Sequence, residues 1–139
     1  YQLKFLFILF LTTSSLLLFS SCNKDEESTD QTTKVKGTYT GTYIESTGGS
    51  SVSVEDVETV VTKESATKIK VNMQVIPGLA GVVFTADMTD ETHFTVPQFT
   101  LNDDDLKGSG SLENDNTLKI DLEKVNSAGD KITFEGERK

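Results

Sequence analysis

Apolar and polar residues alternate along most of the chain from Lys34 onward. The cleanest example is residues 68–75, where Ile69, Val71 and Met73 alternate with lysine, asparagine and glutamine. A period of two places successive side chains on opposite faces, which is typical of a strand with one buried face. No stretch after residue 33 has the three-to-four-residue spacing of a helix. We therefore predict an all-β domain over residues 34–139.

Clusters of glycine, proline, asparagine and aspartate divide this pattern into eight segments. The predicted strands cover residues 35–43, 52–61, 68–75, 82–88, 93–97, 106–112, 118–122 and 131–137. Eight short strands with one apolar face each predict an eight-stranded antiparallel up-and-down barrel, and a two-sheet β-sandwich is the alternative.

Two strands contain a break in the alternation. In the second, Val52 and Val54 have one parity and Val57 and Val61 have the other. A β-bulge near Asp56 adds one residue and reconciles the two halves. The fifth strand is expected to end at Pro97, because proline cannot donate to a ladder.

The N-terminal 21 residues differ from the rest of the chain. An apolar run from Leu3 to Phe19 ends in two serines directly before Cys22, the only cysteine. A spanning helix needs about 20 apolar residues, but threonines and serines at 12–15 interrupt this run. We therefore expect residues 1–21 to be a helical signal peptide. The junction resembles the lipobox of bacterial lipoproteins, which implies lipidation of Cys22 as the mature N-terminus.

Residues 22–33 contain no apolar side chain after the cysteine and are predicted to form a disordered acidic tether. Lys24, Asp25, Glu26 and Glu27 resemble the export signal that sends Bacteroidota lipoproteins to the outer face of the outer membrane. A solvated linker is the alternative. The expected location is the outer membrane, with a lipid anchor and the domain facing the exterior, or else its periplasmic face.

The charge balance limits the partners. The chain has 13 Lys and Arg against 22 Asp and Glu, a net charge of −9. Nucleic-acid binding needs a basic face and is not expected. Attachment to a membrane should come from the lipid anchor, because acidic proteins are not drawn to anionic lipid. The sequence does not fix the oligomeric state, for which we expect a monomer.

Four segments resemble the calycin-like, lipocalin-like domains of small Bacteroidota lipoproteins: Gly37–Tyr43, Asp90–Pro97, Gly108–Leu112 and Ile132–Gly136. The resemblance covers nearly the whole domain. It implies an eight-stranded barrel, a lipoprotein address and, for most members, no assigned biochemical role.

One position departs from the lipocalin pattern, which has a tryptophan two residues after the glycine of the first strand. Tyr39 stands there, and the chain has no tryptophan. We expect Arg138, after the last strand, to pack on Tyr39 as a cation–π plug. A solvated Arg138 at a fraying terminus is the alternative.

Large and small residues share the predicted inward face, so the interior can be a cavity or a tapered, filled core. We expect a filled or shallow interior, with a hydrophobic pocket at the open end for a small apolar or amphipathic ligand. The alternative is a solid barrel that docks a membrane or secreted partner through an apolar patch at residues 77–83. The candidate ligand-binding residues are Tyr39, Tyr43, Phe84, Met88 and Phe94.

Catalysis has little support, and we expect a protein that is not an enzyme. His93 is the only histidine; it can reach Asp90 or Glu91 but has no nucleophile at a recognisable spacing. The turn Asn102–Asp105 lacks the spacing of an EF-hand loop, so a solvated turn is favoured over a calcium site. No metal or cofactor is expected.

Overall fold

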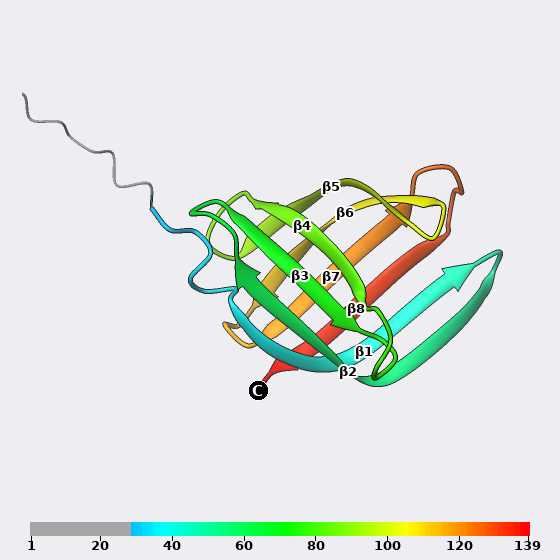
Figure 1. Cartoon of the computed structure of the whole chain (residues 1–139), viewed down its shortest axis with the longest axis horizontal. Helices are drawn as coiled ribbons and strands as arrows, with labels where there is room; N and C mark the ends of the chain where they lie inside the picture. The colour runs from blue at the N-terminus through cyan, green and yellow to red at the C-terminus, as the bar shows by residue number, and fades with distance from the viewer. Residues whose placement is uncertain (1–28) are drawn as a thin grey trace, which may run out of the picture.

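The computed structural model describes residues 29–139, which form eight β-strands (Figure 1). In this part of the chain no helix is long and apolar enough to cross a membrane. The predicted signal peptide, Cys22 and the export signal Lys24–Glu27 lie outside the described residues. The strands are β1 (Gly37–Thr47), β2 (Ser50–Lys63), β3 (Lys68–Gln74), β4 (Val82–Met88), β5 (His93–Leu101), β6 (Asp104–Glu113), β7 (Thr117–Lys124) and β8 (Lys131–Arg138).

The strands close into an up-and-down barrel in which each strand pairs with its neighbours in sequence. Closure is made by β1 and β8, which pair antiparallel from Tyr39 opposite Arg138 to Ser46 opposite Lys131. This ladder confirms the barrel and excludes the β-sandwich, because a sandwich would leave these two strands unpaired with each other.

The predicted bulge in the second strand is confirmed. Gly41 pairs with Val57 and Tyr43 with Val54, so Glu55 and Asp56 together lie opposite the single residue Thr42. Asp56 takes a positive φ of 56°. The extra residue returns Val57, Thr59 and Val61 to the interior, where their side chains are buried.

The predicted end of the fifth strand was wrong. β5 continues through Pro97 to Leu101, with a register shift between Val96 and Phe99. Pro97 and Gln98 lie together opposite Lys107 and form a bulge. Proline has no N–H to donate, and at a bulge the regular ladder hydrogen bond is not needed. The bulge also explains the changed parity of Phe99 and Leu101.

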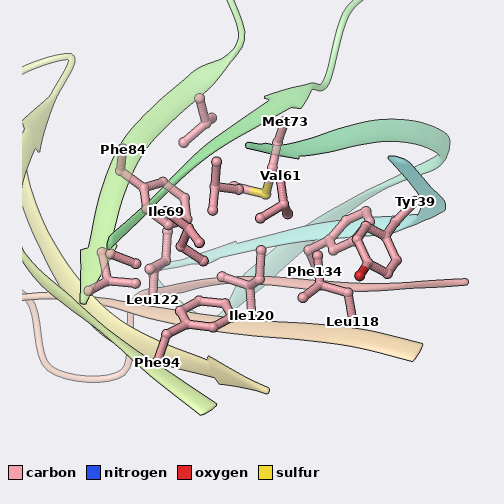
Figure 2. Packing of buried hydrophobic residues seen from close by; sticks show 14 of the residues in the cluster. Tyr39, Val61, Ile69, Met73, Phe84, Phe94, Leu118, Ile120, Leu122 and Phe134 are labelled. Atoms are coloured by element: carbon pink, nitrogen blue, oxygen red, sulfur yellow. The ribbon is translucent and has the colours of Figure 1, made fainter. Parts of the chain in front are cut away.

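Glycines in the wall make room for aromatic rings inside. Phe94 pairs across the ladder with Gly110, and a Cβ at Gly110 would lie 2.2 Å from the Phe94 ring. Phe134 lies against Gly136 in the same way. Large and small inward residues therefore fit together into a filled core. The aromatic and aliphatic side chains labelled in Figure 2 pack against one another in the middle of the barrel.

The two ends of the barrel differ. We call the end with the turns 63–68, 88–93 and 113–117 the closed end, and the end with the loops 47–50, 75–81, 101–104 and 124–131 the mouth. The chain enters at the closed end, beside the C-terminus (Figure 1). Lys139 donates its backbone N–H to the carbonyl of Thr38 there. Residues 29–139 contain all eight strands and a complete core of their own.

The ordered domain begins earlier than we predicted. The last residues of the expected tether pack on the closed end: Thr32 is fully buried, and Gln31 donates its backbone N–H to the carbonyl of Ala66 at 2.9 Å. Asp30 pairs with Lys63 at 2.5 Å. These polar contacts hold residues 30–33 in place without an apolar side chain, which is why composition alone did not reveal them.

Candidate functional site

The five candidate ligand-binding residues do not line one cavity. All are buried, with exposed fractions of at most 8%. Tyr39, Met88 and Phe94 lie toward the closed end. Phe84 stacks on Phe99 with ring centroids 5.3 Å apart. Tyr43 alone among the five reaches the pocket at the mouth, so the central cavity considered from the sequence is replaced by packed side chains.

The closed end is sealed by the predicted contact between Arg138 and Tyr39. The Arg138 guanidinium carbon lies 5.3 Å from the centroid of the Tyr39 ring, within the range of a cation–π contact. Arg138 also donates to the Tyr39 hydroxyl at 2.8 Å and to the carbonyl of Lys34. The Tyr39 hydroxyl in turn donates to the carbonyl of Val35 at 2.8 Å. No ligand can enter past these contacts without displacing them.

The mouth holds a pocket of about 430 Å³, a volume within the range of small-molecule sites. One wall is apolar and comes from β2, the loop 75–81, β4, and the facing ends of β5, β6 and β8. Its floor is the top of the core, because Val82, Leu106 and Ile132 are buried. The apolar wall is made by Val52, Val54, Val75, Ile76, Leu79, Ala80, Val82, Leu101, Leu106 and Ile132.

The polar wall of the pocket comes from β1, β6 and β7. The Lys124 ammonium lies 2.9 Å from Asp104 and 4.0 Å from Glu45. Glu45 accepts a hydrogen bond from the Tyr43 hydroxyl at 3.2 Å. The hydrogen bond to Asp104 raises the pKa of Lys124, and burial, together with Glu45, raises the pKa of Tyr43. Both side chains therefore keep their protons at neutral pH.

The rim of the mouth exposes apolar side chains. Val52 is 65% exposed, Leu79 60% and Ile76 55%. The apolar patch predicted at residues 77–83 is present, because Val83 is also exposed on the outer face of β4. Large exposed apolar residues gathered at one opening are typical of a surface that meets a ligand or a partner.

A second hollow of about 590 Å³ lies on the outside of the barrel over β1, β7 and β8. It is a trough between outward threonines and charged side chains of these strands. Lys119 crosses it, 2.9 Å from Glu113 and 3.9 Å from Glu135. The trough is larger than the mouth pocket, but most of its lining side chains are polar or charged. The Thr40 hydroxyl in this lining is buried and has no hydrogen-bond partner among the described residues.

The remaining candidate residues form local turns. His93 is exposed, and its Nδ1 lies 2.9 Å from Asp90 Oδ2 in a short loop. Asn102 and Asp103 both have positive φ, as the tight turn between β5 and β6 requires. Among residues 29–139, no three His, Cys, Asp or Glu side chains gather as metal ligands would.

The sequence analysis missed the charged residues of the mouth. Each charged residue lies two positions from the last inward-facing apolar residue of its strand, so its side chain also faces inward: Glu45 follows Tyr43, Lys124 follows Leu122, and Asp104 precedes Leu106. Three inward-facing charged residues at one end of the barrel could have indicated a polar site from the sequence. All three positions lie just outside the strands that we predicted, 35–43, 106–112 and 118–122.

No protein-family model matches the sequence, and a search of the curated proteins found no match. Solved structures do match in fold. A redesigned beta barrel, b11L5F_LGL, has 15% identity and a TM-score of 0.56, covering 80% of this chain and 96% of that one. EF1p2_mFAP2b bound to DFHBI has 12% identity and a TM-score of 0.54, covering 81% and 98%.

A third similar structure is a putative outer membrane protein of Bacteroides fragilis, with 15% identity and a TM-score of 0.56. The match covers 79% of this chain and 53% of that protein, so the chain spans about half of its length. At these identities the three structures support the fold alone, a small β-barrel.

Proposed function

We propose that this chain is a lipid-anchored protein of the cell envelope whose barrel binds a small apolar or amphipathic molecule at its mouth. The observation that carries the binding role is the mouth pocket, which combines an apolar wall over the core with a polar wall of Glu45, Asp104 and Lys124. We propose binding rather than catalysis, and the exposed contact between His93 and Asp90 lies in a loop at the other end of the barrel.

The proposed location in the cell envelope rests mainly on the N-terminal sequence. Cys22 and the apolar run before it support a lipid anchor, and the acidic residues Asp25–Glu27 support export to the outer face of the outer membrane. The structural similarity to a Bacteroides fragilis protein with an outer-membrane description agrees with an envelope location. The structure of EF1p2_mFAP2b with DFHBI is consistent with small-molecule binding by a barrel of this size.

The binding role is tested by native mass spectrometry of the chain from Asn23 onward, purified gently from its own host. We expect a co-purifying small molecule. In a Val54→Trp variant the indole should fill the pocket, and the extra mass should disappear. Ser53→Trp, on the outward parity of the same strand, is the matched control and should keep the ligand. A bare wild-type mass would argue against the proposal.

The anchor is tested separately in the full-length protein. Cys22→Ala should remove the incorporated lipid and move the protein from the membrane to the soluble fraction. Replacing Lys24–Glu27 with alanines should keep the lipid but remove the protein from the cell surface, as measured by protease accessibility on whole cells. Continued membrane attachment of Cys22→Ala would contradict the anchor.

A second candidate function is docking of a protein partner. The exposed rim residues Val52, Ile76, Leu79 and Val83 favour it, since they surround a filled core. In that case, Leu79→Asp should abolish capture of the partner by surface crosslinking, and Val54→Trp should leave capture intact. The reverse pattern would favour the small ligand.

A further inference from the structure

The charged side chains of the mouth pocket differ in exposure. The Lys124 side chain is 10% exposed, whereas the side chains of Glu45 and Asp104 are 43% and 49% exposed. The Lys124 side chain is therefore the most covered of the three. The two carboxylate side chains are the more accessible ones to a molecule that enters the pocket.

Lys124 already forms ion pairs within the protein. Lys124 lies 2.9 Å from Asp104 and 4.0 Å from Glu45, and Asp130 adds a further attraction that keeps its pKa raised. Among the described residues that line the pocket, Lys124 is the single cation, facing two carboxylates. The polar wall therefore has one more carboxylate than it has cations, and both carboxylate side chains are partly exposed.

The Tyr43 hydroxyl, the nearest neutral donor, already forms a hydrogen bond within the protein. The Tyr43 hydroxyl gives its hydrogen to Glu45 and is buried with the rest of the ring. It offers no free donor to an anionic group. The remaining oxygen sites of Glu45 and Asp104 can accept hydrogen bonds from a ligand, and charge-assisted bonds of this kind are the stronger ones.

Apolar side chains lie directly beside these carboxylates: Glu45 pairs across the ladders with Val52 and Ile132, and Asp104 with Leu101. Val82 and Ile132 give the apolar wall a buried base, and Leu79 and Ile76 extend it toward solvent. An apolar tail on this wall would place its polar head beside Glu45 and Asp104. A carboxylate or sulfate head would be repelled there, whereas an ammonium head would be attracted.

We infer that the mouth of the barrel selects amphiphiles with a cationic amine head and an apolar tail, and discriminates against fatty-acid-like anions. The inference rests on the proposed binding function and adds the ligand class. The overall charge of −9 acts in the same direction, because it raises the local concentration of cations around the protein.

The test uses three ten-carbon probes of equal tail length: decylamine, 1-decanol and decanoate. Each is titrated into the chain from Asn23 onward by isothermal titration calorimetry at pH 7 and low salt, below the concentration at which the probe forms micelles. We expect decylamine to bind about tenfold or more tightly than decanoate, with decanol between them. Raising the salt concentration should narrow this gap.

Variants locate the effect. Glu45→Gln preserves the acceptor for Tyr43 and should weaken decylamine binding by about threefold to tenfold without changing decanol binding. Asp104→Asn should act in the same direction and covers the case in which Glu45→Gln folds poorly. Glu58→Gln, at the closed end and paired with Lys139, is the control and should change nothing.

The outcomes separate the two proposals. Decanoate binding as tightly as decylamine, or an unchanged preference in both variants, would overturn the cationic class and leave a pocket that binds amphiphiles. Failure of all three probes to bind would count against the proposed binding function itself.

Discussion

At the scale of single residues, the barrel interior depends on pairs of one glycine and one aromatic ring. Gly110 faces the Phe94 ring, and an added Cβ would also lie 2.7 Å from the carbonyl oxygen of Lys119. Neither neighbour can retreat easily, because one is buried in the core and the other is part of the ladder between β6 and β7. The glycine is therefore a packing residue of the core.

We expect Gly110→Ala to destabilise the domain by about 1–3 kcal/mol, the usual cost of overpacking a filled core. Thermal unfolding followed by circular dichroism should show a clearly lower Tm. Ser109→Ala, at the neighbouring outward position, is the control and should leave the Tm nearly unchanged. An unchanged Tm in Gly110→Ala would mean that the ring has free space beside it.

Tyr43 joins the core to the polar wall of the mouth. Its pKa in the folded state is raised above the unfolded value of about 10 by burial and by Glu45. Below pH 10 the phenol is neutral in both states and its contribution to stability is constant. As the pH rises above 10, the unfolded state releases the proton first, so the free energy of unfolding falls.

Urea unfolding between pH 9 and 11.5 measures this loss. We expect Tyr43→Phe to lower the free energy of unfolding at pH 8 by about 1 kcal/mol through the lost hydrogen bond, and to make its decline above pH 10 shallower than in the wild type. Some decline should remain, because burial raises the pKa of Tyr39 as well. Parallel pH profiles for wild type and variant would contradict the role of Tyr43.

At the scale of the strands, two bulges set which residues face inward. The one at Asp56 was predictable, because it separates valines of opposite parity on a long strand. The one at Pro97 was not, because a proline signals the end of a strand as readily as a bulge. The alternation of apolar and polar residues therefore predicted eight strands. The continuation of β5 beyond Pro97 depends on its pairing with β6, which the residues of β5 alone do not predict.

Asp56 tests the first bulge. Its φ of 56° lies in the left-handed region, which aspartate tolerates and β-branched residues strongly disfavour. We expect Asp56→Val to destabilise the domain by about 1–2 kcal/mol, measured by chemical denaturation, although valine favours strands elsewhere. Ser51→Val, an exposed position on the same strand, should be neutral. Equal effects of the two substitutions would argue against the bulge.

At the scale of the whole molecule, closure depends on the last strand. β8 pairs with both β1 and β7, so it completes a sheet that otherwise has two free edges. We expect a chain that ends at Gly129 to lose cooperative unfolding and to aggregate, as seen by sedimentation. Removal of Lys139 alone should be tolerated. A soluble, monomeric truncated chain would show that the other seven strands are self-sufficient.

The sequence predicted the barrel, the first bulge and the Arg138–Tyr39 contact, because each depends on local alternation or on a spacing within the family pattern. It predicted a hydrophobic pocket at the open end, but not the charged residues that line it. Glu45, Asp104 and Lys124 are far apart in the chain and meet only because the barrel closes. The choice between a cavity and a filled core also required three dimensions, since it depends on which ring faces which glycine.

The chain enters the barrel at the closed end, and this position of the N-terminus affects how a ligand would reach the mouth pocket. Residues 29–36 and the C-terminus share one end, and the pocket opens at the other. The proposed lipid anchor would therefore hold the barrel by its closed end, remote from the mouth pocket. The proposed ligand would then enter and leave the pocket without release of the protein from the membrane.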